Sequence, residues 1–155
     1  MLFKCKNIVL IGCLILLVQT TLTSWTRPVK GIYSNDIGEA VKCLQQCFDT
    51  ELSKVKIKRY ELTITDKGFF RLRKYFRNGK EEYYSFNLQK IAGLDYFGTT
   101  ANGTLSIKTK SEDIIVQSFH DPKGDIDSMS SVIDIPLKNI EAEQLNMLYA
   151  GLVGR

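Results

Sequence analysis

The sequence predicts an α+β fold, namely a small antiparallel β-barrel or curved sheet of about seven strands with one helix before it and one after it. Apolar residues recur at helical spacing after residue 36 and again after residue 139, and they alternate with period two in between. Turn sequences separate the alternating runs, and Asn78-Gly79 predicts a hairpin with a type I′ turn. With 155 residues, 44% hydrophobic and 25% charged, the chain fits one globular domain plus a short targeting segment.

Residues 1–24 are expected to be a signal peptide or an N-terminal anchor. Two lysines precede an uncharged apolar run, Ile8 to Val18, which is shorter than the ~20 residues that span a bilayer comfortably. Small polar residues follow where a signal peptidase would cut, which favours cleavage. The uncharged stretch nevertheless continues to Ser24, and Leu10–Cys13 resembles the lipobox of bacterial lipoproteins. We therefore expect an exported domain, secreted, periplasmic or tethered to the outer face of the membrane, with membrane contact only through an uncleaved N-terminal segment.

Residues 25–35 are expected to be a tether, and residues 36–155 a single domain. Asp36 and Glu39 have the form of a capping box, and an amphipathic helix is predicted from about 36 to 50. Two cysteines, Cys43 and Cys47, share one row of this helix. They would form a disulfide only in an irregular turn, because residues i and i+4 of a regular helix lie ~5–6 Å apart at Cβ. The alternative is a pair of small buried apolar side chains.

The strands are expected between residues 55 and 137. Their ranges are Val55–Ile64, Phe70–Phe76, Tyr84–Leu88, Ile91–Phe97, Leu105–Thr109, Ile114–Phe119 and Val132–Leu137. A turn is expected at Asn102-Gly103 and a polar loop from His120 to Ser130. A terminal amphipathic helix should follow, with Asn139 as its N-cap.

Short antiparallel strands followed by a C-terminal helix resemble the pleckstrin-homology-like (PH-like) barrel domains of bacteria. The resemblance covers about residues 55–153 and rests on element order. Lipid-binding members of that family carry a lysine at the end of the first strand and a basic-x-Arg element on the second, which Lys67 and Arg71-Leu72-Arg73 match. The intervening loop is shorter here, and export removes the domain from cytosolic phosphoinositides. The earlier helix leaves an alternative open, a cystatin-like or nuclear-transport-factor-like domain with a helix across a curved sheet.

The most distinctive feature of the mature chain is basic. Residues 54–80 contain ten Lys or Arg against two acids, and period-two spacing puts three arginines on one strand face beside Tyr75. The predicted ligand-binding residues are Lys67, Arg71, Arg73, Tyr75 and Arg77. Such a face suits a protein partner or an anionic cell-surface ligand, and a solvated face that prevents edge aggregation is the alternative. Without residues 1–24 the net charge is +2, too small to indicate a nucleic-acid partner.

The sequence offers little for catalysis, so we expect a binding module and not an enzyme. His120 is the only histidine, and a small hydrolase centred on it would use Ser118 or Asp121. The acidic run from His120 to Ser128 lacks EF-hand spacing, and the cysteines do not form a zinc set. No phosphate-binding glycine loop occurs, so neither a metal nor a cofactor is expected. The chain could also be a carrier of apolar ligands, which would require an internal cavity.

Overall fold

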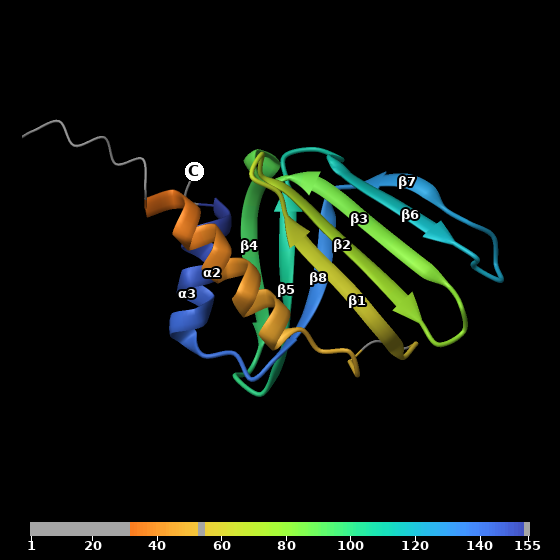
Figure 1. The fold of residues 1–155 in the computed structure, drawn as a ribbon, viewed down its shortest axis with the longest axis horizontal. Coiled ribbons are helices and arrows are strands. Elements are labelled where there is room, and N and C mark those ends of the chain that lie inside the picture. The colour runs from red at the N-terminus through yellow and green to blue at the C-terminus, as the bar shows by residue number, and fades with distance from the viewer. Residues whose placement is uncertain (1–31, 53–54, 154–155) are drawn as a thin grey trace, which may run out of the picture. The chain divides into compact units, whose positions relative to one another are not determined.

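The computed structural model describes residues 32–52 and 55–153. The predicted signal or anchor and residues 25–31 of the predicted tether lie outside the described residues. The elements are α2 (Ile32–Cys47), β1 (Ile57–Ile64), β2 (Phe69–Phe76), β3 (Glu81–Asn87), the short 3-10 helix η1 (Leu88–Lys90), β4 (Ile91–Gly98), β5 (Asn102–Thr109), β6 (Ile114–Phe119), β7 (Asp127–Ser130), β8 (Val132–Lys138) and α3 (Ala142–Val153) (Figure 1). Within that part of the chain, no helix is long and apolar enough to cross a membrane.

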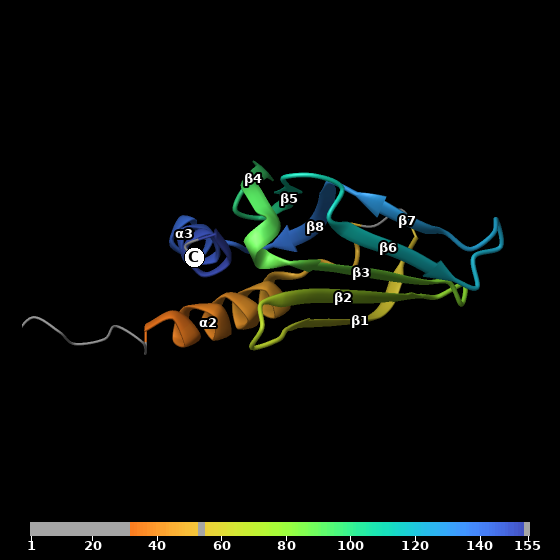
Figure 2. The same cartoon turned by 90° about the horizontal axis from the view of Figure 1, so that it is seen from above.

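The α+β class, with one helix before the antiparallel strands and one after them, is confirmed, but the described residues form eight strands instead of about seven, and these do not close into a barrel. They form two antiparallel sheets, one of five strands in the order β1-β2-β3-β6-β7 and one of three in the order β4-β5-β8. Three runs of chain pass from one sheet to the other through short corners, at η1, at residues 110–113 and at Ser131. The two sheets therefore lie at an angle, as Figure 2 shows.

The hairpin predicted at Asn78-Gly79 forms, although its turn differs from the type I′ expected from these residues. Gly79 has φ +88°, whereas Asn78 is not among the described residues with positive φ. The Gly79 N–H donates to Phe76 O (3.2 Å) and the Phe76 N–H to Lys80 O (2.9 Å), the pattern of a three-residue loop with a glycine bulge. The β1–β2 loop repeats this pattern around Gly68, which has φ +76°.

Four predicted boundaries were wrong. The first helix begins at Ile32 instead of 36, and residues 127–130 form β7 within the predicted loop. The turn expected at Asn102-Gly103 lies at residues 99–101, because these two residues already pair with β4 and β8. The last helix begins at Ala142, where the Gln144 side chain accepts the Glu141 N–H (2.9 Å), so Asn139 is not its N-cap.

Helix α2 and the residues just after it contact β1, the first strand of one sheet, and β8, the last strand of the other. The Gln45 side chain donates to Leu62 O in β1 (2.9 Å), and the Tyr60 hydroxyl donates to Gln45 O. Beyond the helix, Phe48 bridges Leu137 of β8 and the Asp49 N–H donates to Pro136 O (2.9 Å). The buried residues of this segment are Ala40, Cys43, Leu44, Cys47 and Phe48. They belong to the hydrophobic core that the helices and strands share, and their burial contributes to the stability of the fold.

Cys43 and Cys47 are free thiols on α2, and both are buried. The helix is continuous through both positions, which is the arrangement expected for two small apolar side chains. Burial, together with the smaller effect of the neighbouring Cys47, raises the pKa of the Cys43 thiol to about 11. Cys43 is therefore protonated at neutral pH.

Candidate functional site

The outer face of the five-stranded sheet carries three of the five predicted ligand-binding residues. On β2, Phe70 and Leu72 point into the core, so Arg71, Arg73 and Tyr75 point outward. The remaining two predicted residues, Lys67 and Arg77, occupy the turns before and after β2. At ~3.3 Å per residue they lie roughly 30 Å apart. The structure therefore does not gather all five into one site.

Two arginines of the outer face already have carboxylate partners. Glu81 Oε2 accepts hydrogen bonds from Arg73 Nη2 (2.6 Å) and Nε (3.1 Å), and this contact raises the pKa of Arg73. Arg59 Nη1 donates to Glu61 Oε1 (2.7 Å), while its guanidinium carbon lies 3.8 Å from the Tyr75 ring centroid. Tyr75 is thus covered by Arg59 and also donates to Glu61 (3.2 Å). These groups are largely neutralised by one another.

Arg71 differs from its neighbours, because it is exposed and takes part in none of the ion pairs between described residues. The cross-strand row that contains it continues through Ser85 to Ile115 and Met129. Ile115 is 40% exposed and Met129 49%, and Phe69, two residues before Arg71, is 41% exposed. We call Phe69, Arg71, Ile115 and Met129 the Arg71 patch. It combines one unpaired guanidinium with three exposed apolar side chains.

The inner face of the same sheet holds a polar cluster that sequence reasoning missed. Lys74 lies between Leu72 and Phe76 on the buried side of β2, and its ammonium lies 4.8 Å from the Tyr84 ring centroid. Burial lowers the pKa of Lys74, and the carboxylates of Glu82 and Asp134 oppose that shift. The Tyr84 hydroxyl donates to Glu82 Oε2 (2.9 Å), and burial raises its pKa. A signal was present in the sequence, since Lys74 interrupts the apolar alternation of β2.

An ion-pair network completes this cluster. Lys80 Nζ lies 2.9 Å from Glu82 Oε1 and 2.8 Å from Asp121 Oδ2. The contact with Asp121, followed by that with Glu82, raises the pKa of Lys80, and Lys80 lowers the pKa of Asp121. The network fastens the β6–β7 loop to the β2–β3 turn. With Lys74 included, it balances two cations against two carboxylates.

The residues that a hydrolase would need are not assembled into a cleft. His120 is exposed with φ +58°, and the buried Ser118 hydroxyl accepts the Ile126 N–H (2.8 Å). Asp121 is held by Lys80, as described above. Asp125 Oδ1 accepts the Asp121 N–H (2.9 Å), so these carboxylates organise the loop itself. Across residues 32–52 and 55–153, no three His, Cys, Asp or Glu side chains are grouped so that they would hold a metal ion.

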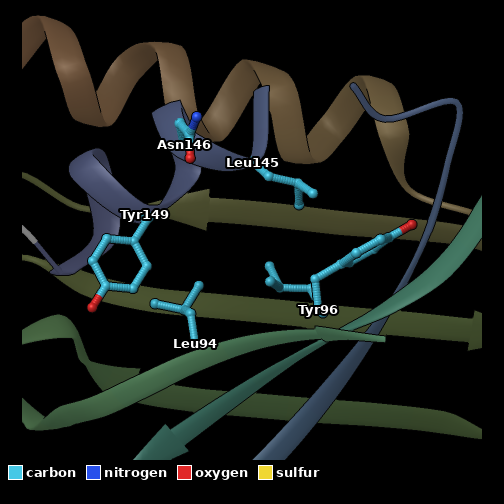
Figure 3. A pocket seen from close by; sticks show the side chains of 6 residues that line it. Leu94, Tyr96, Leu145, Asn146 and Tyr149 are labelled. Atoms are coloured by element: carbon cyan, nitrogen blue, oxygen red, sulfur yellow. The ribbon is translucent and has the colours of Figure 1, made fainter. Parts of the chain in front are cut away.

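A pocket of about 160 Å³ lies between α3 and β4 (Figure 3). Its lining residues are Leu94, Tyr96, Leu105, Leu145, Asn146 and Tyr149. The Tyr96 hydroxyl donates to Thr99 O (2.6 Å), and its ring packs so closely on Gly103 that a Cβ there would overlap it. Burial raises the pKa of Tyr96. Sequence reasoning did not find this pocket, because its two walls are about fifty residues apart in the chain.

Comparisons with known proteins return no match: no protein-family model, curated protein or solved structure is similar to this chain. The function is therefore inferred from the geometry of the chain's own side chains.

Proposed function

We propose that this chain is an exported binding module that recognises a protein partner through the Arg71 patch. The observation that carries the proposal is the exposed, unpaired guanidinium of Arg71 among Phe69, Ile115 and Met129. Arginine, aromatic residues and methionine are enriched at protein interfaces. The complementary partner surface carries one carboxylate flanked by apolar side chains, which would form a charge-assisted pair with Arg71.

The pairing of the neighbouring arginines favours a protein over a polyanionic ligand. A glycan sulfate cluster or lipid headgroup is best bound by several unpaired cations together. On this face Glu61 and Glu81 already neutralise Arg59 and Arg73. One available guanidinium with apolar surroundings suits a single acidic side chain in an otherwise apolar contact.

We consider two alternatives for the fold family of this chain. The strands followed by a terminal helix support the PH-like assignment. The open sheets, and a helix α2 that spans from β1 to β8, support a cystatin-like or nuclear-transport-factor-like domain with a helix across a curved sheet. Fold alone does not assign a function in either case.

A hydrolase and a carrier of apolar ligands have less support. The hydrolase would require His120, Ser118 and Asp121 to share a cleft, and each is committed or exposed elsewhere. The apolar carrier would require a larger space than the α3–β4 pocket, since a cavity of ~150 Å³ holds about one benzene ring.

The test is site-specific photo-crosslinking in the native host. A photoreactive phenylalanine analogue at Met129 should trap one discrete protein, and the same analogue at the exposed Gln46 on α2 should not. With the purified partner, Arg71→Glu should weaken binding at least tenfold, as loss of an interface anchor does. Lys42→Glu, an equal charge change on the exposed side of α2, is the matched control and should change affinity less than about twofold.

Unchanged binding of the partner by Arg71→Glu would refute the proposal. Retention of the wild-type protein on heparin, lost in Arg71→Glu but not in Lys42→Glu, would instead assign the patch to an anionic surface ligand.

A further inference from the structure

The outer edge of β4 has backbone hydrogen-bonding groups without partners among the described residues. β4 is the edge strand of the three-stranded sheet and pairs only with β5. The Thr99 N–H donates to Asn102 O (2.9 Å), so in an antiparallel pair Phe97 and Asp95 direct their backbone groups toward β5. The N–H and C=O of Leu94 and Tyr96 therefore point away from the sheet. An unpaired edge of this kind is a template for another strand.

The same two residues also line the α3–β4 pocket with their side chains. Figure 3 shows Leu94 directed toward Tyr149 of α3, with Leu145 and Tyr96 on the other side of the space. The pocket is preformed, because Tyr96 is held at its hydroxyl by Thr99 and at its ring by Gly103. At about 160 Å³ it accommodates one aromatic or branched aliphatic side chain.

The charge around this groove is acidic. Glu141 and Glu143 lie at the start of α3, both exposed and outside every ion pair between described residues. Helix α3 has no basic residue, and Glu143 precedes Asn146 of the pocket by about one helical turn. On β4 itself, Asp95 is already paired with Lys108 (2.8 Å). A complementary ligand therefore carries positive charge beside its apolar anchor.

We infer that the groove between β4 and α3 binds an extended, basic peptide segment of a partner protein by strand addition. The peptide backbone hydrogen-bonds to Leu94 and Tyr96, one apolar side chain enters the pocket, and a lysine or arginine lies near Glu143. A small apolar molecule would fill the pocket but leave the strand edge unpaired. The inference does not depend on the Arg71 patch, which lies on the other sheet.

The test begins with random nonapeptides displayed on phage and selected against the full-length protein, followed by calorimetry with the selected peptides as synthetic probes. The selected peptides should share one aromatic or aliphatic residue with Lys or Arg within about three positions. Leu145→Trp fills the pocket and should weaken binding at least tenfold. Gln46→Trp places the same indole on the exposed side of α2, away from the pocket, and should change it less than twofold. Glu143→Lys should weaken binding, and Arg71→Glu should leave it unchanged.

Two further measurements remain informative even if Leu145→Trp does not fold. N-methylation of every second peptide amide should weaken binding at least tenfold in one register only, because strand addition uses alternate amides. In hydrogen exchange, the Leu94 and Tyr96 amides should become protected on binding while Asp95 is unchanged.

The proposal is overturned if no peptide is enriched, or if the selected peptides bind Leu145→Trp as well as they bind the wild type. Loss of peptide binding in Arg71→Glu would show that the peptide binds at the Arg71 patch and not in the groove. A concentration-dependent dimer that disappears in Leu145→Trp but not in Gln46→Trp would assign the edge to a second copy of the chain.

Discussion

Lys74 places its ammonium 4.8 Å from the ring centroid of Tyr84, inside the curve of the five-stranded sheet. No described carboxylate lies within ion-pair distance of this ammonium. The aromatic face and the more distant Glu82 and Asp134 stabilise the charge, while burial opposes it and lowers the pKa of Lys74. Because burial has the larger effect on the pKa, the charged Lys74 side chain lowers the stability of the folded protein.

Replacement of Lys74 by methionine should therefore stabilise the protein. We expect Lys74→Met to raise the free energy of unfolding at pH 7 by about 1 kcal/mol, because an apolar chain of similar length replaces a buried charge. The folded pKa of Lys74 lies below its unfolded value of 10.5, so the unfolded chain binds more protons between the two values. The advantage of the variant should accordingly shrink as the pH rises toward 10.5. Urea unfolding at pH 7 and pH 9.5 measures both effects, and a destabilised variant would show that the contact with Tyr84 dominates.

Asp121 should make stability depend on pH at the acidic end. Lys80 lowers the folded pKa of Asp121 below 3.8, so the contribution of this ion pair is complete above pH 3.8 and is lost as the pH falls through the folded pKa. We expect Asp121→Asn to be less stable than the wild type at pH 6, with a difference that disappears in strong acid. Thermal unfolding across this range tests it, and Asp66→Asn is the control because the exposed Asp66 takes part in no ion pair between described residues. A difference that persists in strong acid would contradict the assignment.

The two glycines of separate hairpins should differ in their sensitivity to alanine. Gly98 has φ +150°, and a Cβ there would overlap the backbone of Asn102 and Gly103, which cannot rotate away. Gly79 has φ +88°, but its Cβ would meet open space. We expect Gly79→Ala to cost about 1 kcal/mol from backbone strain alone and Gly98→Ala roughly 2–4 kcal/mol. Urea unfolding of the two variants gives the comparison, and equal costs would mean that the β4–β5 turn relaxes.

The thiols of α2 should be unreactive while the protein is folded. Cys43 and Cys47 are 3% and 4% exposed, so reagents lack access to both, and the pKa of about 11 also keeps Cys43 protonated at pH 8. Iodoacetamide should modify them only after unfolding, as peptide mass spectrometry reports. Because the folded pKa of Cys43 lies above its ordinary value of 9.0, its protonated thiol stabilises the folded protein below pH 9.0. This contribution is lost as the pH rises through about 11. Native disulfide formation between them would contradict this picture.

The local elements of the fold could be predicted from the sequence because each has a strong period. Tyr60, Leu62 and Ile64 alternate clearly, and they lie in β1 as expected. By contrast, the sequence predicts a loop where β7 lies, since Asp127-Ser128-Met129-Ser130 has weak strand propensity. It is a strand because β6 pairs with it, from Gln117–Asp127 to Ile114–Ser130. Pairing between distant segments of this kind leaves no local signal.

The candidate sites could be predicted only where one strand determines them. Alternation on β2 puts Arg71, Arg73 and Tyr75 on one face. Glu61, which pairs with Arg59, lies two residues along the same strand, but Glu81, which neutralises Arg73, lies on β3, and composition does not reveal that register. The α3–β4 groove could not be predicted from the sequence either, because Leu145 and Leu94 come together only in the folded chain.

The bridge between Phe48 and Leu137 has a consequence for how the protein is made. A ribosome completes α2 about 90 residues before it adds β8, which is roughly 5 to 18 s at ordinary rates of synthesis. Throughout that interval Leu44 of α2 and Phe48, which follows the helix, have no last strand to cover them. The nascent chain therefore exposes an apolar surface that chaperones can bind until β8 has been added.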